Sequence, residues 1–235
     1  MEFNVQFMED AFPLLLKAVP VTLAMTAAVL MLSLLPAFVM AAARAEKKKW
    51  ASRFIALYVS FIRGTPLILQ LLLLYSLLPS LLNWYFKSIG SDFNVFEAVK
   101  PFWYGVMVFT LHTTALLSEV FRSAILSVPA GQMDAGLSVG MKQSSVYWRI
   151  ILPQALRSAI PNICNVTIGL IKGTSLAFFL GVKDIMAEAR VQASFGFNYV
   201  EAYLDVFLLY LLICTIVQIL YWAGERYVTI GGRNV

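Results

Sequence analysis

Long apolar stretches recur along the chain, separated by shorter polar segments. They cover residues 18–43, 53–86, 101–129, 158–182 and 206–224. Each is long enough to cross the roughly 30 Å hydrocarbon core of a bilayer as an α-helix. The second is longer than one span needs, which leaves room for its end past Pro79 to lie on the outer surface. The pattern predicts an all-α integral membrane protein with about five transmembrane helices, in a single membrane domain of residues 1–235.

The composition argues against soluble classes of protein. Hydrophobic residues make up 60% of the 235 residues and charged residues only 13%, with a mean hydropathy of +0.77. A soluble domain of this size cannot bury so much apolar surface. Cys164 and Cys214 lie in apolar stretches, so we expect them to pack as small hydrophobic residues rather than to form a disulfide or bind a metal. No set of residues resembles a catalytic triad or a metal site.

Positive charges between the apolar stretches predict the orientation. The loops after the first and third stretches and the C-terminal tail carry Arg44, Lys47, Lys48, Lys49, Arg53, Lys142, Arg149, Arg157, Arg226 and Arg233. Because the positive side is normally cytoplasmic, we expect the N-terminus outside and the C-terminus inside. The net charge of +5 therefore indicates membrane orientation rather than a nucleic-acid partner.

The longest cytoplasmic connection, about 130–153, has an internal pattern. Residues 132–139 are expected to form a short helix that ends at Gly140 in a left-handed conformation. Ser144 or Ser145 is expected to cap a second short helix through Arg149, and Pro153 to start the next element. Two such helices suit either the membrane interface or a knob that docks into a partner.

This connection resembles the EAA loop of ABC importer permeases. That pattern is Glu-Ala-Ala, three residues, Gly, nine residues, Ile, one residue and Leu-Pro. It is matched without a gap by Asp134, Ala135, Gly136, Gly140, Ile150, Leu152 and Pro153. Asp134 replaces Glu and keeps a negative charge near a helix start, where the helix dipole favours it. Gly136 replaces Ala and is expected to loosen the helix by up to about 1 kcal/mol.

Three further segments resemble the polar amino-acid branch of that family. Residues 61–70 contain its Arg-Gly-Thr-Pro-Leu signature, and residues 118–132 resemble its Glu-x-x-Arg…Val-Pro-x-Gly-Gln segment. Residues 172–176 resemble its Lys-Asp-Thr-Ser-Leu, with Gly173 in place of Asp. The resemblance is close from residue 61 to 176 and loose before that.

The resemblance implies a type I ABC importer permease fold and the import of polar amino acids or related compounds. It implies cytoplasmic ABC ATPase subunits that bind the loop, and a second permease copy or a related permease. An extracellular or periplasmic amino-acid-binding protein would deliver the substrate at the bacterial plasma or inner membrane. The chain has no Gly-x-x-x-x-Gly-Lys-Ser/Thr phosphate loop. We therefore expect a transport subunit rather than an enzyme, with no cofactor of its own and with ATP acting through the partner.

Four charges lie within the predicted spans. Arg63 and Glu119 each lie about ten residues, or roughly 15 Å, from the cytoplasmic ends of their spans. An unpaired charge at such a depth costs at least about 2.5–3.5 kcal/mol, so an Arg63–Glu119 pair is one expectation. Arg122, three residues after Glu119 on the same helix face, is the alternative partner. Lys172 needs its counter-charge from a neighbouring helix or from a substrate carboxylate. These charges are candidates for a gate or substrate path, with a purely structural role as the alternative.

Small polar residues in the spans complete the candidate substrate path. They are His112, Thr113, Thr174 and Ser175. Such residues also hold membrane helices together without binding a ligand. Pro66, Pro79 and Pro161 are candidate helix breaks, which line cavities in many transporters. A small membrane channel or a secondary transporter would use similar residues, but neither needs an ATPase-coupling loop.

Overall fold

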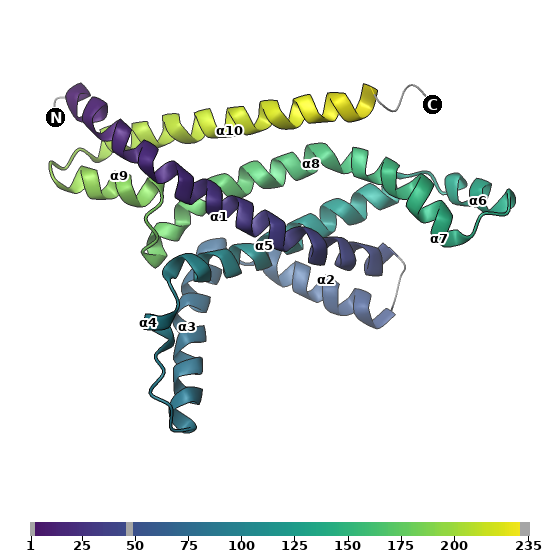
Figure 1. Cartoon of the computed structure of the whole chain (residues 1–235), viewed down its shortest axis with the longest axis horizontal. Coiled ribbons are helices and arrows are strands. Elements are labelled where there is room, and N and C mark those ends of the chain that lie inside the picture. The colour runs from purple at the N-terminus through teal and green to yellow at the C-terminus, as the bar shows by residue number, and fades with distance from the viewer. Residues whose placement is uncertain (1–2, 46–48, 231–235) are drawn as a thin grey trace.

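The computed structural model describes residues 3–45 and 49–230, and within these ranges every regular element is helical (Figure 1). The elements are α1 (Val5–Ala45), α2 (Lys49–Gly64), α3 (Leu67–Ser88), α4 (Val95–Ala98), α5 (Pro101–Ser127), α6 (Gly131–Ser138), α7 (Gln143–Val146), a π-helical turn η1 (Tyr147–Ile151), α8 (Leu152–Gly173), a 3-10 helix η2 (Thr174–Leu180), α9 (Ile185–Ser194) and α10 (Tyr199–Ile230). Helical stretches long and apolar enough to cross a membrane cover Val5–Ala45, Leu67–Ser88, Pro101–Ser127, Gln143–Leu180 and Tyr199–Arg226. The prediction of an all-α protein with five membrane helices is confirmed.

The second predicted span, 53–86, is divided into two helices, and the break lies at Pro66, one of the three candidate positions. The stretch 53–86 is broken between Gly64 and Leu67, and α2 and α3 leave the break in different directions (Figure 1). Pro66 has an extended backbone, with ψ of 131°, and disfavours helix at the residue before it. Pro79 and Pro161 lie inside α3 and α8 and do not end them.

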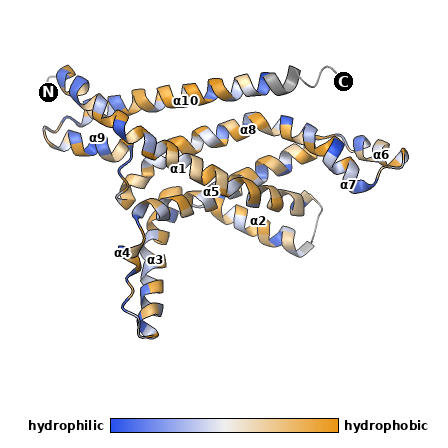
Figure 2. Ribbon diagram, in the orientation of Figure 1, coloured by the Kyte–Doolittle hydropathy of each residue, from blue (hydrophilic) through white to orange (hydrophobic). Residues whose placement is uncertain are grey.

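Helix α5 lies at the centre of the bundle. It packs against α1, α2, α3 and α8. Phe109 and Leu117 of α5 and Met25 of α1 are almost completely buried. A separate apolar cluster around Leu15 and Leu209 joins α1, α9 and α10. The outer faces of α1 and α10 carry many exposed apolar side chains, as expected for helices that lie in lipid (Figure 2).

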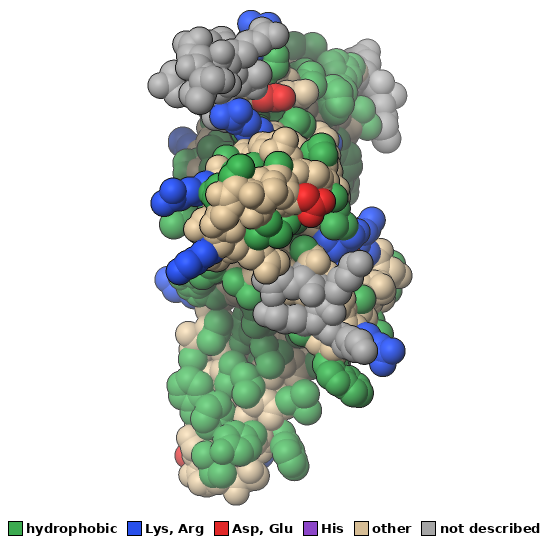
Figure 3. Space-filling model, turned by 90° about the vertical axis from the view of Figure 1, so that its right-hand side faces the viewer, with side chains coloured by type: hydrophobic (Ala, Val, Ile, Leu, Met, Phe, Trp, Pro, Cys, Tyr) green, Lys and Arg blue, Asp and Glu red, His purple; other side chains and the backbone are tan. Residues whose placement is uncertain are grey.

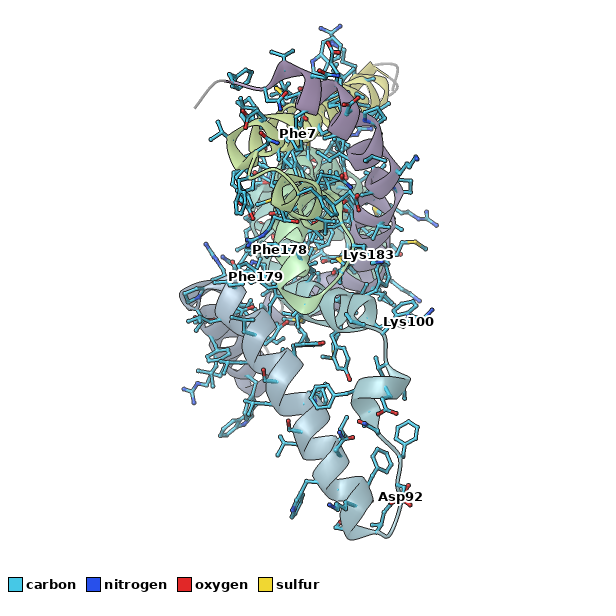
Figure 4. All side chains as sticks on the ribbon, turned by 90° about the vertical axis from the view of Figure 1, so that its left-hand side faces the viewer. Phe7, Asp92, Lys100, Phe178, Phe179 and Lys183 are labelled. Atoms are coloured by element: carbon cyan, nitrogen blue, oxygen red, sulfur yellow. The ribbon has the colours of Figure 1, made fainter. Side chains whose placement is uncertain are left out.

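Residues 67–98, comprising α3, α4 and the loop between them, project from the bundle as an arm (Figures 1 and 4). Asp92 lies at the tip of the arm (Figure 4). Leu69, Leu73, Leu77 and Leu81 are each at least half exposed and follow one another at intervals of four residues. At that spacing they form an apolar stripe along one face of α3.

The connection after α5 forms the predicted first short helix. Helix α6 ends where Gly140 takes a positive φ of 82°. The Gly140 amide donates to the Leu137 carbonyl at 3.0 Å, and the Met141 amide donates to the Gly136 carbonyl at 3.1 Å. These two hydrogen bonds are the Schellman arrangement, which satisfies the last carbonyls of a helix. The left-handed stop at Gly140 is confirmed.

The second short helix differs from its prediction. Helix α7 begins at Gln143, so Ser144 and Ser145 lie inside it rather than at its cap. The helix also does not stop at Arg149, because the π turn η1 carries it without a gap into α8. Pro153 therefore lies in the first turn of α8 within a continuous helical stretch, and its missing N–H leaves one backbone hydrogen bond unmade. A π turn beside that position accommodates the irregularity.

Candidate functional site: the helix break, its cavity and the coupling loop

One side chain holds the two ends of the helix break together. Gln70, in the first turn of α3, is buried, and its Nε2 lies 2.8 Å from the Ile62 carbonyl. The same nitrogen lies 3.1 Å from the Thr65 carbonyl and 2.8 Å from the Thr65 hydroxyl. On its other side, Gln70 Oε1 lies 3.2 Å from His112 Nδ1 on α5. Because lipid offers no hydrogen-bond donors to carbonyls freed by a break, the Gln70 amide supplies them.

A cavity of about 340 Å³ lies beside the break, where α3, α5 and α8 meet. Its polar lining side chains are His112, Thr113 and Asn165, and no charged side chain of the described residues lines it. The structure thus brings together His112 and Thr113, two of the predicted path residues. Sequence reasoning missed Asn165, although Asn165, Gly169 and Gly173 share one helix face at intervals of four residues. The two glycines leave space at the wall of the cavity.

Glu119 lies between two arginines. Arg122 donates to Glu119 Oε2 through Nε at 2.9 Å and through Nη2 at 2.8 Å, and Arg44 donates to Glu119 Oε1 through Nη1. The three side chains are largely shielded, since none is more than 30% exposed. We call them the ion-pair triad. It joins the last turn of α1 to α5.

The Arg63–Glu119 pair expected from equal depth is wrong. Glu119 is paired with Arg122, the alternative partner, and with Arg44, which sequence reasoning placed in a loop. Arg44 reaches Glu119 because α1 continues to Ala45, beyond the predicted end of the span. Arg63 lies next to the break, at the end of α2, and lines a hollow of about 430 Å³ together with Arg44 and Glu119.

The remaining candidates lie away from the cavity at the break. Lys172 is exposed, and none of the ion pairs among the described residues includes it. Thr174 is buried and donates its hydroxyl to the Ile171 carbonyl at 2.7 Å. Ser175 donates to the Lys172 carbonyl at 2.7 Å. Both hydroxyls therefore bond within the junction of α8 and η2.

The loop of residues 130–153, which its sequence pattern predicts to be the ATPase-coupling loop, is closed by a tight contact between α6 and α7. A Cβ atom added to Gly136 would lie 2.6 Å from Val146 Cγ2, well inside van der Waals contact. Gly136 and Val146 are both buried. Gly136 therefore lets α6 lie directly against α7, and this contact offsets the low helix propensity of glycine. The other motif residues are placed as follows: Asp134, Ala135, Gly140 and Pro153 are exposed, Ile150 is half-buried and Leu152 is buried.

Comparisons with known proteins agree with this architecture. The profile of the family described as the inner membrane component of binding-protein-dependent transport systems matches residues 34–228. The chain belongs to this family. It is a permease subunit of an ABC importer, a multi-pass protein of the inner membrane. Permeases of this family work with ATPase subunits and a substrate-binding protein.

Individual relatives cover almost the whole permease. The probable amino-acid ABC transporter permease PatM of Vibrio harveyi is 40% identical, over 96% of this chain and 97% of its own length. The probable amino-acid permease YxeN of Bacillus subtilis is 38% identical over 94% of each chain. A solved amino acid ABC transporter with histidines has a chain that is 25% identical, with a TM-score of 0.81 over 97% of this permease and 100% of that chain. The methionine transporter MetNI, at 15% identity and a TM-score of 0.71 over 91% of this chain and 95% of its own, shares the fold.

The contact between α6 and α7 makes a first prediction. Gly136→Ala should lower ATP-dependent transport several-fold, because overpacking a tight contact costs about 1–3 kcal/mol and moves α6 away from Val146. Adding Val146→Ala to Gly136→Ala should restore transport by making room. Gly131→Ala is the matched control, since a Cβ there meets nothing within 4 Å. The measurement is uptake by the assembled transporter in vesicles, normalised to permease content. Equal uptake by the Gly136→Ala and Gly131→Ala variants would contradict the prediction.

The ion-pair triad makes a second prediction. Glu119→Gln should reduce the folded yield of the permease, because Arg44 and Arg122 lose their shared partner in a largely shielded site. Breaking a fully buried pair costs about 3–5 kcal/mol, which is the upper bound for this partly buried triad. Arg44→Gln added to Glu119→Gln should recover yield, whereas Arg63→Gln added to Glu119→Gln should not. The measurement is the monodisperse fraction in size-exclusion chromatography. Equal recovery by both double variants would contradict the assignment of Arg44 as the partner.

Proposed function

We propose that this permease imports polar amino acids or related compounds. Relatives across the whole chain support the substrate class: PatM and YxeN carry amino-acid names, and the L-cystine transport permease TcyB of Bacillus subtilis is 33% identical over 93% of this chain. The observation that carries the mechanism is the closed α6–α7 knob, which presents Asp134 and Ala135 on its exposed surface. A rigid exposed knob suits docking into a groove of a partner. The docking partner is the cytoplasmic ATPase.

ATP acts on the permease through that partner. The chain has no phosphate-binding loop of the Gly-x-x-x-x-Gly-Lys-Ser/Thr type, so it is a transport subunit and not an enzyme. Closure of the ATPase subunits moves the knob, and α5 connects the knob to the cavity at the helix break. The whole chain, residues 1–235, acts as one membrane domain, and no cofactor is required by it.

A second permease, either a copy or a related chain, covers the arm. The arm contributes little buried surface to its own bundle, and its apolar stripe is exposed from Leu69 to Leu81, over about three turns of α3. In a pair of permeases, this stripe would be buried against protein, and the rest of the exposed apolar surface of the arm would face lipid.

The coupling loop lies on the cytoplasmic side, and the N-terminus outside. Lys and Arg side chains are prominent on the end of the molecule that carries α6 and α7 (Figure 3). An excess of positive charge is typical of the cytoplasmic side. An extracellular or periplasmic binding protein delivers the amino acid from the opposite side.

ATP dependence tests the proposed function. The permease, reconstituted in vesicles with its ATPase and binding protein, should take up a labelled amino acid only when ATP is present on the side of the coupling loop. Omission of the ATPase should abolish uptake. Uptake that continues without the ATPase would instead identify a channel or a secondary transporter.

Thiol labelling tests the orientation. Cysteines introduced at Asp92 and Gln143, both exposed, should differ in their reaction with a membrane-impermeant reagent. Asp92→Cys should react from outside intact cells, and Gln143→Cys only after permeabilisation. Cys164 and Cys214 are removed first, and the variant without introduced cysteines is the control. The reverse labelling pattern would overturn the orientation.

A further inference from the structure

The hydrogen bonds at the helix break determine which groups His112 offers to the cavity. Gln70 Nε2 faces two carbonyl oxygens, those of Ile62 and Thr65, so this end of the side chain must be the NH₂ donor. A flipped amide would place Oε1 against both carbonyls. Gln70 Oε1 therefore faces His112, and it can only accept.

The tautomer of His112 follows from this assignment. Since Gln70 Oε1 accepts, His112 Nδ1 carries a proton and donates to it at 3.2 Å. In a neutral imidazole with the proton on Nδ1, Nε2 is an acceptor. No hydrogen bond to Nε2 is found within the described residues, and the imidazole lines the cavity of about 340 Å³. The cavity thus contains an acceptor that is held in place but is not used by the protein itself.

The rest of the lining limits what fits. Asn165 offers an amide, Thr113 a hydroxyl, and the other described lining residues are apolar, so none of them is a carboxylate, a lysine or an arginine. A solute with a net charge would find no counter-charge there, and burying an uncompensated charge is costly. The cavity has the size and the mainly apolar wall with a few polar groups that small-molecule sites usually have.

We propose that this cavity holds the solute inside the membrane, that His112 Nε2 accepts a hydrogen bond from its amino group, and that the solute carries no net charge. Gln70 is a positioning residue that fixes the imidazole tautomer. This inference rests on the proposed function and adds the recognition chemistry of the membrane site. It also links the solute to the break, because the same Gln70 side chain bonds both His112 and the carbonyls of residues 62 and 65.

Binding to the permease–ATPase complex without binding protein tests the proposal. Each of the twenty common L-amino acids, radiolabelled, is dialysed to equilibrium against the detergent-solubilised complex. We expect binding of amino acids without net charge and at least tenfold weaker binding of lysine, arginine, aspartate and glutamate. The analogue of the tightest-binding amino acid that lacks its α-amino group should also bind at least tenfold more weakly, because it loses a charge-assisted hydrogen bond. Since this analogue also carries a net negative charge, the comparison of the His112 variants assigns the lost hydrogen bond.

Substitutions assign the effect to His112. His112→Phe keeps a ring but removes the acceptor. It should therefore weaken binding of the amino acid at least tenfold and change binding of the des-amino analogue hardly at all. His112→Gln keeps a donor for Gln70 and an acceptor for the solute, and should retain most of the affinity. Leu116→Met, which changes an apolar wall of the same cavity, is the control and should affect both ligands equally.

The outcomes separate this inference from the proposed function. The proposed role of His112 is wrong if the wild-type permease binds the des-amino analogue as tightly as the amino acid. It is also wrong if His112→Phe weakens the binding of both ligands equally. If the complete transporter takes up an amino acid that the complex does not bind, the cavity is not the membrane site. A failure of all uptake by the complete transporter, or uptake that continues without the ATPase, would count against the proposed function.

Discussion

The structure depends on the need to satisfy backbone carbonyls where a membrane helix is broken. Pro66 ends the helical path after Gly64, and the freed carbonyls of Ile62 and Thr65 lie where lipid cannot solvate them. Gln70 bonds both. Because the NH₂ group of Gln70 donates to these carbonyls, its amide oxygen faces α5 and accepts from His112 Nδ1, which fixes the tautomer of His112. The direction of the arm and the hydrogen bonding of His112 at the cavity follow from this one break.

Helix α5 physically connects the cavity at the helix break with the loop of residues 130–153. Phe109, His112 and Thr113 line the cavity, Glu119 and Arg122 belong to the ion-pair triad, and the knob of α6 and α7 follows directly. The triad also ties α5 to the last turn of α1. Under the proposed function, a displacement of the knob would reach the cavity through this one helix, and α1 is held to that helix near its end. Coupling through a packed helix of this kind requires no flexible link.

Hydropathy was sufficient to predict the five membrane helices, because each apolar stretch must span the same thickness of lipid. Hydropathy could not place the break, since Pro66, Pro79 and Pro161 look alike in sequence. Among the hydrogen bonds of the described residues, Pro66 alone of the three has a side chain, Gln70, that satisfies the carbonyls around it. The left-handed stop at Gly140 was predictable because it depends on one residue's backbone freedom.

Features that depend on contacts between distant residues were not predictable. Arg44 was assigned to a loop because the charge-free stretch ends before it, although the helix continues. Glycine is needed at position 136 because Val146, ten positions away and on another helix, leaves no room for a Cβ atom. His112 and Thr113 were identified as path candidates, but the direction of the His112 acceptor required the hydrogen bonds of Gln70.

The most direct measurement is a structure of the assembled transporter, with an ATPase that binds ATP without hydrolysing it, in a saturating concentration of the transported amino acid. Density for the amino acid should lie in the cavity between His112 and Asn165, with its amino group within hydrogen-bond distance of His112 Nε2 and the bonds of Gln70 in place. Density for the amino acid elsewhere in the permease, with this cavity filled by side chains, would contradict the account.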